Sequence, residues 1–145
     1  MKLPDGTVLQ VKVGPSGMPD PAKTPLFTVD TVGMLMNSKD KLAIWAIGGD
    51  VKTSSPLDIT IEPLLMPGIS VKTKGVPGQR FSFHGWDTDE TPVAWKWLDD
   101  PDISYFPVRV SGRDQKTGET ASAIACGAFN PMMKEIIKHS IEWGE

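Results

Sequence analysis

Cysteine and histidine are scarce in this chain, which has 145 residues with one cysteine, Cys126, and two histidines. A single cysteine forms no disulfide within the chain, so the fold must be stable without one. One cysteine and two histidines also cannot build a tetrahedral zinc site unless carboxylates or another subunit help. We therefore assign no metal and no cofactor, and we expect Cys126, which lies in a run of small side chains, to be a buried structural thiol.

Clusters of basic residues and long apolar runs are also missing. The 15 Lys and Arg residues are outnumbered by 18 Asp and Glu residues, and they form no basic patch of the kind that phosphate-backbone binding requires. The longest nearly unbroken apolar run, 42–47, is far too short to cross a membrane. The first residues lack the apolar core of a signal peptide. We expect a cytoplasmic protein that binds neither nucleic acid nor membrane.

The short motifs of common enzymes are absent. Gly48-Gly49 has neither the glycine spacing of a dinucleotide fingerprint nor the Lys-Ser/Thr ending of a phosphate loop, and Asp50 adds a negative charge there. The serine nucleophile elbow, the HExxH pattern and the CxxC motif do not occur. These residues do not decide whether the chain is an enzyme, but they favour a non-enzymatic function.

Proline and glycine are plentiful, with 13 and 14 residues, and they separate short apolar or alternating runs. Such runs are typical of strands. They predict a mainly β fold, an antiparallel β-sandwich or barrel of about eight or nine short strands with one C-terminal α-helix, in a single domain 1–145. The nine runs are 7–13, 26–36, 41–48, 58–64, 69–74, 80–84, 93–98, 105–110 and 119–126.

Three pairs of runs are spaced as hairpins. The polar connection 37–40 joins the first pair, 26–36 and 41–48, and Pro67-Gly68 suits a tight turn in the second, 58–64 and 69–74. The third joins 105–110 to 119–126 through a segment that ends in Gly118. There the residues predict a type I turn closed by a left-handed glycine.

The two ends of the chain have different patterns. Residues 14–25 contain four prolines and two glycines, which predict a loop or an extended arm. Residues 130–143 predict a helix, with Asn130 as its N-cap, Pro131 at the first helical position and Gly144 after its end. One face of that helix is an apolar stripe with a single serine, formed by Met133, Ile136, Ile137, Ser140 and Ile141.

The densest group of polar and aromatic residues begins at His84. Histidine is the side chain whose ordinary pKa lies closest to neutrality, so His84 is the natural general base of a small-molecule site. Exposed tryptophans could stack on a ligand or anchor a partner. The simpler interpretation, which we favour, is a solvent-facing histidine on an alternating strand. The candidate ligand-binding residues are His84, Trp86, Asp87, Asp89, Trp95 and Trp97.

Two acidic stretches, 87–90 and 99–102, could hold a hard cation such as calcium through carboxylate oxygens. Their spacing does not match the EF-hand loop. Because Asp and Thr side chains also stabilise ordinary turns, we favour solvated strand connections at both places.

Two functions remain open. The favoured one is a non-enzymatic assembly or protein-binding module, such as a structural or accessory subunit that associates with itself or with another protein. Strands with apolar residues on both faces need cover on both sides, and an oligomer would supply it. The alternative is a small ligand-binding protein or enzyme with a pocket near His84, Trp86 and Asp87.

Overall fold

The computed structural model describes residues 1–3, 6–15, 18–37, 42–65, 70–88 and 105–128. This part of the chain contains strands and no helix, so the mainly β prediction is confirmed. The expected strand 93–98 and the expected helix 130–143 lie outside the described residues. The strands are β1 (Ala22–Lys23), β2 (Phe27–Asn37), β3 (Leu42–Val51), β4 (Leu57–Pro63), β5 (Val71–Gly75), β6 (Arg80–Thr88), β7 (Tyr105–Asp114) and β8 (Thr120–Ala128).

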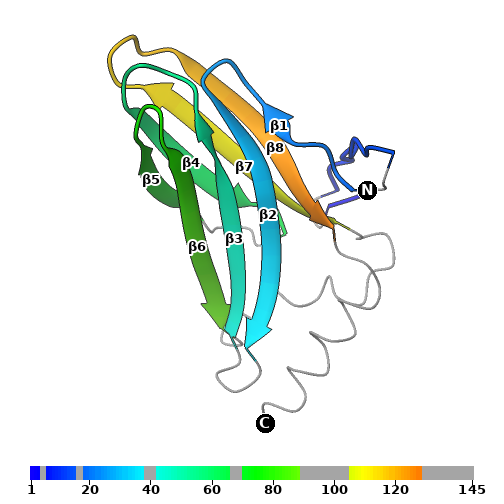
Figure 1. The fold of residues 1–145 in the computed structure, drawn as a ribbon. Helices are drawn as coiled ribbons and strands as arrows, with labels where there is room; N and C mark the ends of the chain where they lie inside the picture. Colours follow the sequence, from blue (N-terminus) through cyan, green and yellow to red (C-terminus); the bar gives the residue numbers. More distant parts are fainter. Residues whose placement is uncertain (4–5, 16–17, 38–41, 66–69, 89–104, 129–145) are drawn as a thin grey trace.

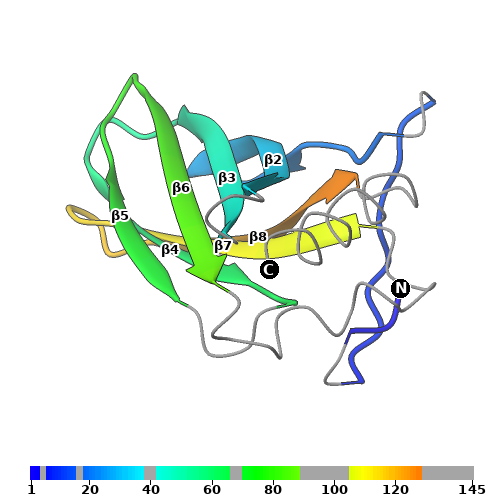
Figure 2. The same cartoon turned by 90° about the horizontal axis from the view of Figure 1, so that it is seen from below.

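The strands form two antiparallel sheets of four, in the orders β1-β2-β3-β6 and β5-β4-β7-β8. The two sheets lie one over the other as separate layers (Figures 1 and 2). All three expected hairpins are confirmed, as β2–β3, β4–β5 and β7–β8. Among the described strands each sheet ends in an edge strand, so these strands do not close into a barrel, which was one of the two expected architectures.

The core lies between the layers because the strands alternate. On β4, Leu57, Ile59 and Ile61 are buried, whereas the residues between them are exposed or half-buried. Successive side chains of a strand point to opposite faces, so this period of two gives the second sheet one apolar and one polar face. The buried residues of the other strands include Phe27, Val29, Ile47, Phe81, Phe106, Val108 and Val110.

Two glycines allow the layers to approach closely. A Cβ atom on Gly112 of β7 would lie 2.9 Å from Cε1 of Phe27, which is fully buried. On Gly127 of β8 it would lie 2.6 Å from the carbonyl oxygen of Val32 in β2. Real Cβ contacts are longer than this, so the packing of β2 against the second sheet requires glycine at both positions.

The β7–β8 connection has the predicted turn chemistry. Asp114 accepts the backbone N–H groups of Lys116 and Thr117 on Oδ1, at 2.8 and 3.2 Å. Gly118 has a φ of 75° and donates its N–H to the carbonyl of Asp114 at 2.9 Å. The left-handed conformation favours glycine, as the sequence indicated.

A β-bulge marks the outer face of the first sheet. Val29 pairs with Gly49 and Thr31 with Gly48, which leaves Asp30 as an extra residue on β2. Arg80 of β6 crosses β3 to donate both terminal nitrogens to the Asp30 carboxylate, and one of them also reaches the Thr31 hydroxyl at 3.0 Å. The bulge is therefore tied to the far edge of its sheet.

The expected strand 7–13 is wrong. Only isolated bridges occur there, between Lys2 and Val8 and between Val13 and Pro19. The backbone bonds instead to nearby turns, with the Leu9 N–H donated to Met1 at 2.7 Å. Prolines within 14–25 lack the N–H donors that a longer ladder would need. Among the described residues of 14–25, the structure has β1 and the bridge at Pro19.

Candidate functional site

Three of the six sequence-predicted ligand residues lie on β6. His84 pairs with Ala46 of β3, and Asp87 pairs with Ala43, with no register shift between them. Positions three apart on a strand fall on opposite faces, so β6 does not by itself place His84 beside Asp87. Trp86 also lies on β6. Asp89, Trp95 and Trp97 are outside the described residues, and the pocket expected there stays a prediction.

The expected cation sites are mostly outside the described residues too. Of the stretches 87–90 and 99–102, only positions 87 and 88 are described, at the end of β6. Within the described ranges no group of three His, Cys, Asp or Glu residues is arranged to hold a metal ion.

The position of β8 at the edge of its sheet is one of two features that sequence analysis did not predict. The nine residues of β8, Thr120–Ala128, contain no charge and no proline. Among the described residues it pairs with β7 alone. Natural sheets usually protect an edge with a charge, a proline or a bulge, because the unpaired backbone groups otherwise accept another strand. The other long edge strand, β6, carries Arg80 and Asp87.

The chain that precedes β1, here called the N-terminal segment, lies beside this edge. A cleft of about 260 Å³ is lined by residues 9–12 and 19–23 and by Ala123, Ile124 and Cys126 of β8. Backbone hydrogen bonds of the described N-terminal segment run within that segment, for example from Asp20 to Lys12 at 2.9 Å. The segment is therefore close to β8 without continuing its sheet.

Three large apolar side chains of the N-terminal segment are exposed. Val8 is 74% exposed, Met18 56% and Val13 45%. Val76, in the β5–β6 connection, is also exposed, at 49%. A gathering of exposed apolar residues on one segment is typical of a surface that a partner covers.

A shallow groove on the outer face of the second sheet is the other unpredicted feature. It has a volume of about 830 Å³ and is lined by residues of all four strands. Cross-strand pairing arranges its side chains in two rows. One row is Lys74, Asp58, Arg113 and Thr120, and the other is Lys72, Thr60, Ser111 and Ser122.

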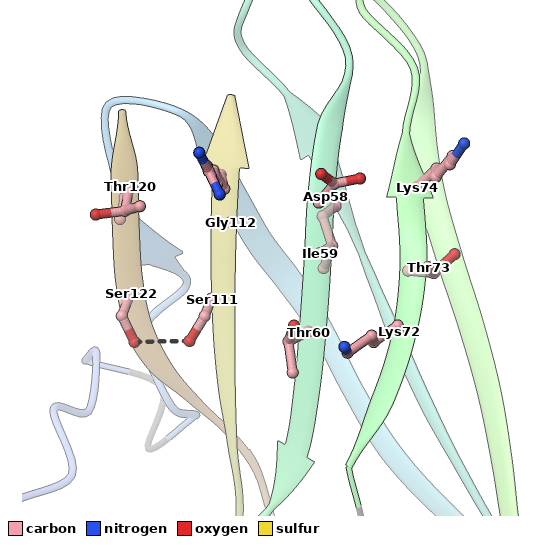
Figure 3. A pocket seen from close by; sticks show the side chains of 12 residues that line it. Asp58, Ile59, Thr60, Lys72, Thr73, Lys74, Ser111, Gly112, Thr120 and Ser122 are labelled. Carbon is pink, nitrogen blue, oxygen red and sulfur yellow. Dashed lines mark hydrogen bonds between the residues drawn. The ribbon is translucent and has the colours of Figure 1, made fainter. Parts of the chain in front are cut away.

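Short hydroxyl side chains form the floor of this groove. Ser111 and Ser122 share a hydrogen bond of 3.2 Å across β7 and β8, drawn in Figure 3. The same view shows Lys72 reaching from β5 toward Thr60 of β4. Asp58 accepts an N–H from the side chain of Gln115 at 2.8 Å. Among the described residues the ion pairs are those of Arg80, so the groove cations have no ion-pair partner there.

Sequence analysis missed the groove because its residues come from separate hairpins. Asp58 and Arg113 meet only through the β4–β7 pairing. The signal that could have found it is alternation, since Lys72 and Lys74 on one strand and Asp58 and Thr60 on another each occupy a single face. Alternation does not say which strands are neighbours.

Cys126 is half-buried on β8, less buried than the sequence predicted. Burial raises the pKa of its thiol from 9.0 to about 11. A nucleophilic cysteine needs the opposite shift, from a cation or a helix N-terminus.

Compared with known proteins, the chain matches no family model and no curated protein sequence. No helix in the described ranges has the length and apolar character needed to cross a membrane.

Proposed function

We propose that this chain is a non-enzymatic β-sandwich module that assembles with copies of itself by strand addition. Residues 7–13 of one copy pair along the β8 edge of the next. The observation that carries the proposal is the long edge of β8, without charge or proline, beside a segment on which exposed apolar residues gather.

In strand addition, residues 7–13 would exchange their isolated bridges for a continuous ladder along β8. An added strand would take the backbone groups on the outer side of β8, and its alternate side chains would be covered by the neighbouring copy. Residues 7–13 have the alternating, valine-rich pattern that suits a half-buried strand. Their pairing with β8 of another copy is a heterologous contact, which builds rings or filaments according to the rotation between copies.

The experiment is the solution mass of the purified chain, measured by light scattering over a series of micromolar concentrations. The native chain should exceed the monomer mass. Two variants, Val8→Asp with Val13→Asp, and Ile124→Glu alone, should raise the dissociation constant at least about tenfold, because each would bury a charge beside the added strand. Ile124 lies opposite Arg109, so the glutamate has a local partner in the monomer.

Val76→Asp is the matched control, because it makes the same exchange at an exposed apolar residue away from both surfaces. A native chain that stays monomeric at all concentrations would contradict the proposal. So would a mass that falls as much for Val76→Asp as for the N-terminal variant. Thermal unfolding of each variant checks that the fold is kept.

A further inference from the structure

We propose that the groove on the outer face of the second sheet binds an extended acidic polypeptide segment of a partner protein. This surface extends onto β8 at Thr120 and Ser122, but its three cations lie on β5 and β7, so its occupation does not depend on self-assembly.

The local charge of the groove is opposite to that of the whole chain. Lys72, Lys74 and Arg113 line it together with one carboxylate, Asp58, whereas the chain as a whole has a net charge of −3. None of the three cations forms an ion pair among the described residues, although Asp58 lies between Lys74 and Arg113 in its row. Asp58 is held by the neutral side chain of Gln115.

The spacing of the cations selects an extended ligand. Lys72 and Lys74 are two positions apart on β5, which is about 7 Å, and Arg113 is two strands away from Lys74, which is about 10 Å. At the level of the backbone, the three cations are therefore spread over the groove. In an extended peptide, carboxylates at alternate positions also repeat every 7 Å or so.

The hydroxyl side chains on the floor of the groove make the binding of an acidic segment more specific than charge attraction alone. Thr60, Ser111 and Ser122 lie in one row beside Lys72 and can donate hydrogen bonds to carboxylate or backbone oxygens of a bound segment. Because these side chains are short, a ligand can approach the sheet while the longer lysines contact it from one side. Such binding is electrostatic, so it should be weak and sensitive to salt.

The test measures binding of a short fluorescent poly-glutamate peptide to the full chain by anisotropy at low salt, about 50 mM. The triple variant Lys72→Ala, Lys74→Ala, Arg113→Ala should weaken binding at least about tenfold, and Asp58→Asn should strengthen it. The control triple variant, Lys2→Ala, Lys23→Ala, Lys116→Ala, changes the net charge equally at exposed lysines outside the groove and should bind like the native chain.

Three results would overturn the proposal. One is no saturable binding of poly-glutamate at low salt, and another is an equal loss in the control variant. The third is equal binding of a DNA duplex, which would indicate a general polyanion surface. Light scattering of the groove variant keeps the two proposals apart, because its mass should equal that of the native chain.

Discussion

Ser55 donates its hydroxyl to Oδ1 of Asp114 at 2.7 Å, and both residues are buried. The bond joins the β3–β4 connection to the turn of the β7–β8 hairpin, far along the chain. It lowers the pKa of Asp114, and the N–H groups of Lys116 and Thr117 act in the same direction. This one carboxylate oxygen therefore stabilises the β7–β8 turn. It also fixes the β3–β4 connection, which joins the two sheets, to that turn.

Replacing Ser55 with alanine should lower the thermal midpoint by a few degrees, because the buried carboxylate loses a hydrogen-bond donor. The matched change Ser54→Ala, at the exposed neighbour, should leave the midpoint nearly unchanged. The folded-state pKa of Asp114 is lowered, so this stabilisation is present above the ordinary pKa of aspartate and is lost as pH falls through the lowered pKa. Equal midpoints for the two variants at neutral pH would contradict the role given to Ser55.

Acid should remove the contribution of the bulge ion pair. The hydrogen bond from Arg80 is the main cause that lowers the pKa of Asp30 from 3.8 to about 2. At neutral pH, Asp30→Asn should reduce the free energy of unfolding by less than about 1 kcal/mol, since the pair is partly exposed. The difference should be present above about pH 4 and disappear as pH falls toward 2.

Urea unfolding at a series of pH values measures this difference. For Arg80→Met, which removes the other partner, the difference in unfolding free energy from the native chain should also disappear in acid. If the difference in unfolding free energy between the native chain and a variant stays constant from neutral pH to about pH 2, the ion pair is not the cause of that difference.

Among the described glycines, Gly49 is the position at which a Cβ would meet the closest atom. A Cβ there would overlap the carbonyl oxygen of Thr28 beside the bulge. We expect Gly49→Ala to cost about 2–4 kcal/mol of unfolding free energy, because backbone atoms have to move. At Gly33, on the same hairpin, a Cβ meets nothing within 4 Å, and Gly33→Ala should change stability by less than about 1 kcal/mol. Similar losses in both variants would refute the steric argument.

Cys126 should react slowly in the folded chain. A thiol pKa of about 11 instead of 9.0 lowers the thiolate fraction about 100-fold at a pH near 8. Alkylation by iodoacetamide, followed by mass spectrometry, should be slow in buffer and fast in urea. Equal rates in the two conditions would mean that the thiol is neither buried nor shifted.

Local sequence patterns predicted the three hairpins. They did not predict how the hairpins associate into sheets. The turn from Asp114 to Gly118 could be predicted because its residues fix their own backbone through a side-chain acceptor and a left-handed glycine. The alternation on β4 likewise places Ile59 and Asp58 on opposite faces whichever strands are its partners.

The failures come from non-local constraints. Residues 7–13 have a strand pattern, yet a strand needs a neighbour with free donors, and the proline-rich chain around Pro19 and Pro21 supplies few. The groove requires the pairing of β4 with β7, which periodicity cannot specify. The aromatic cluster at His84 remains a hypothesis because half of its residues lie outside the described ranges.

The pairing of β4 with β7 also sets the order in which the parts of the second sheet can form during synthesis. Leu57 pairs with Asp114 and Pro63 with Val108, so the middle of the second sheet joins strands that are synthesised far apart. The local hairpin β4–β5 can form early, before β7, the other partner of β4, has left the ribosome. Until β7 arrives, one edge of β4 keeps unpaired backbone N–H and C=O groups, so the nascent chain exposes a strand edge that other strands can join.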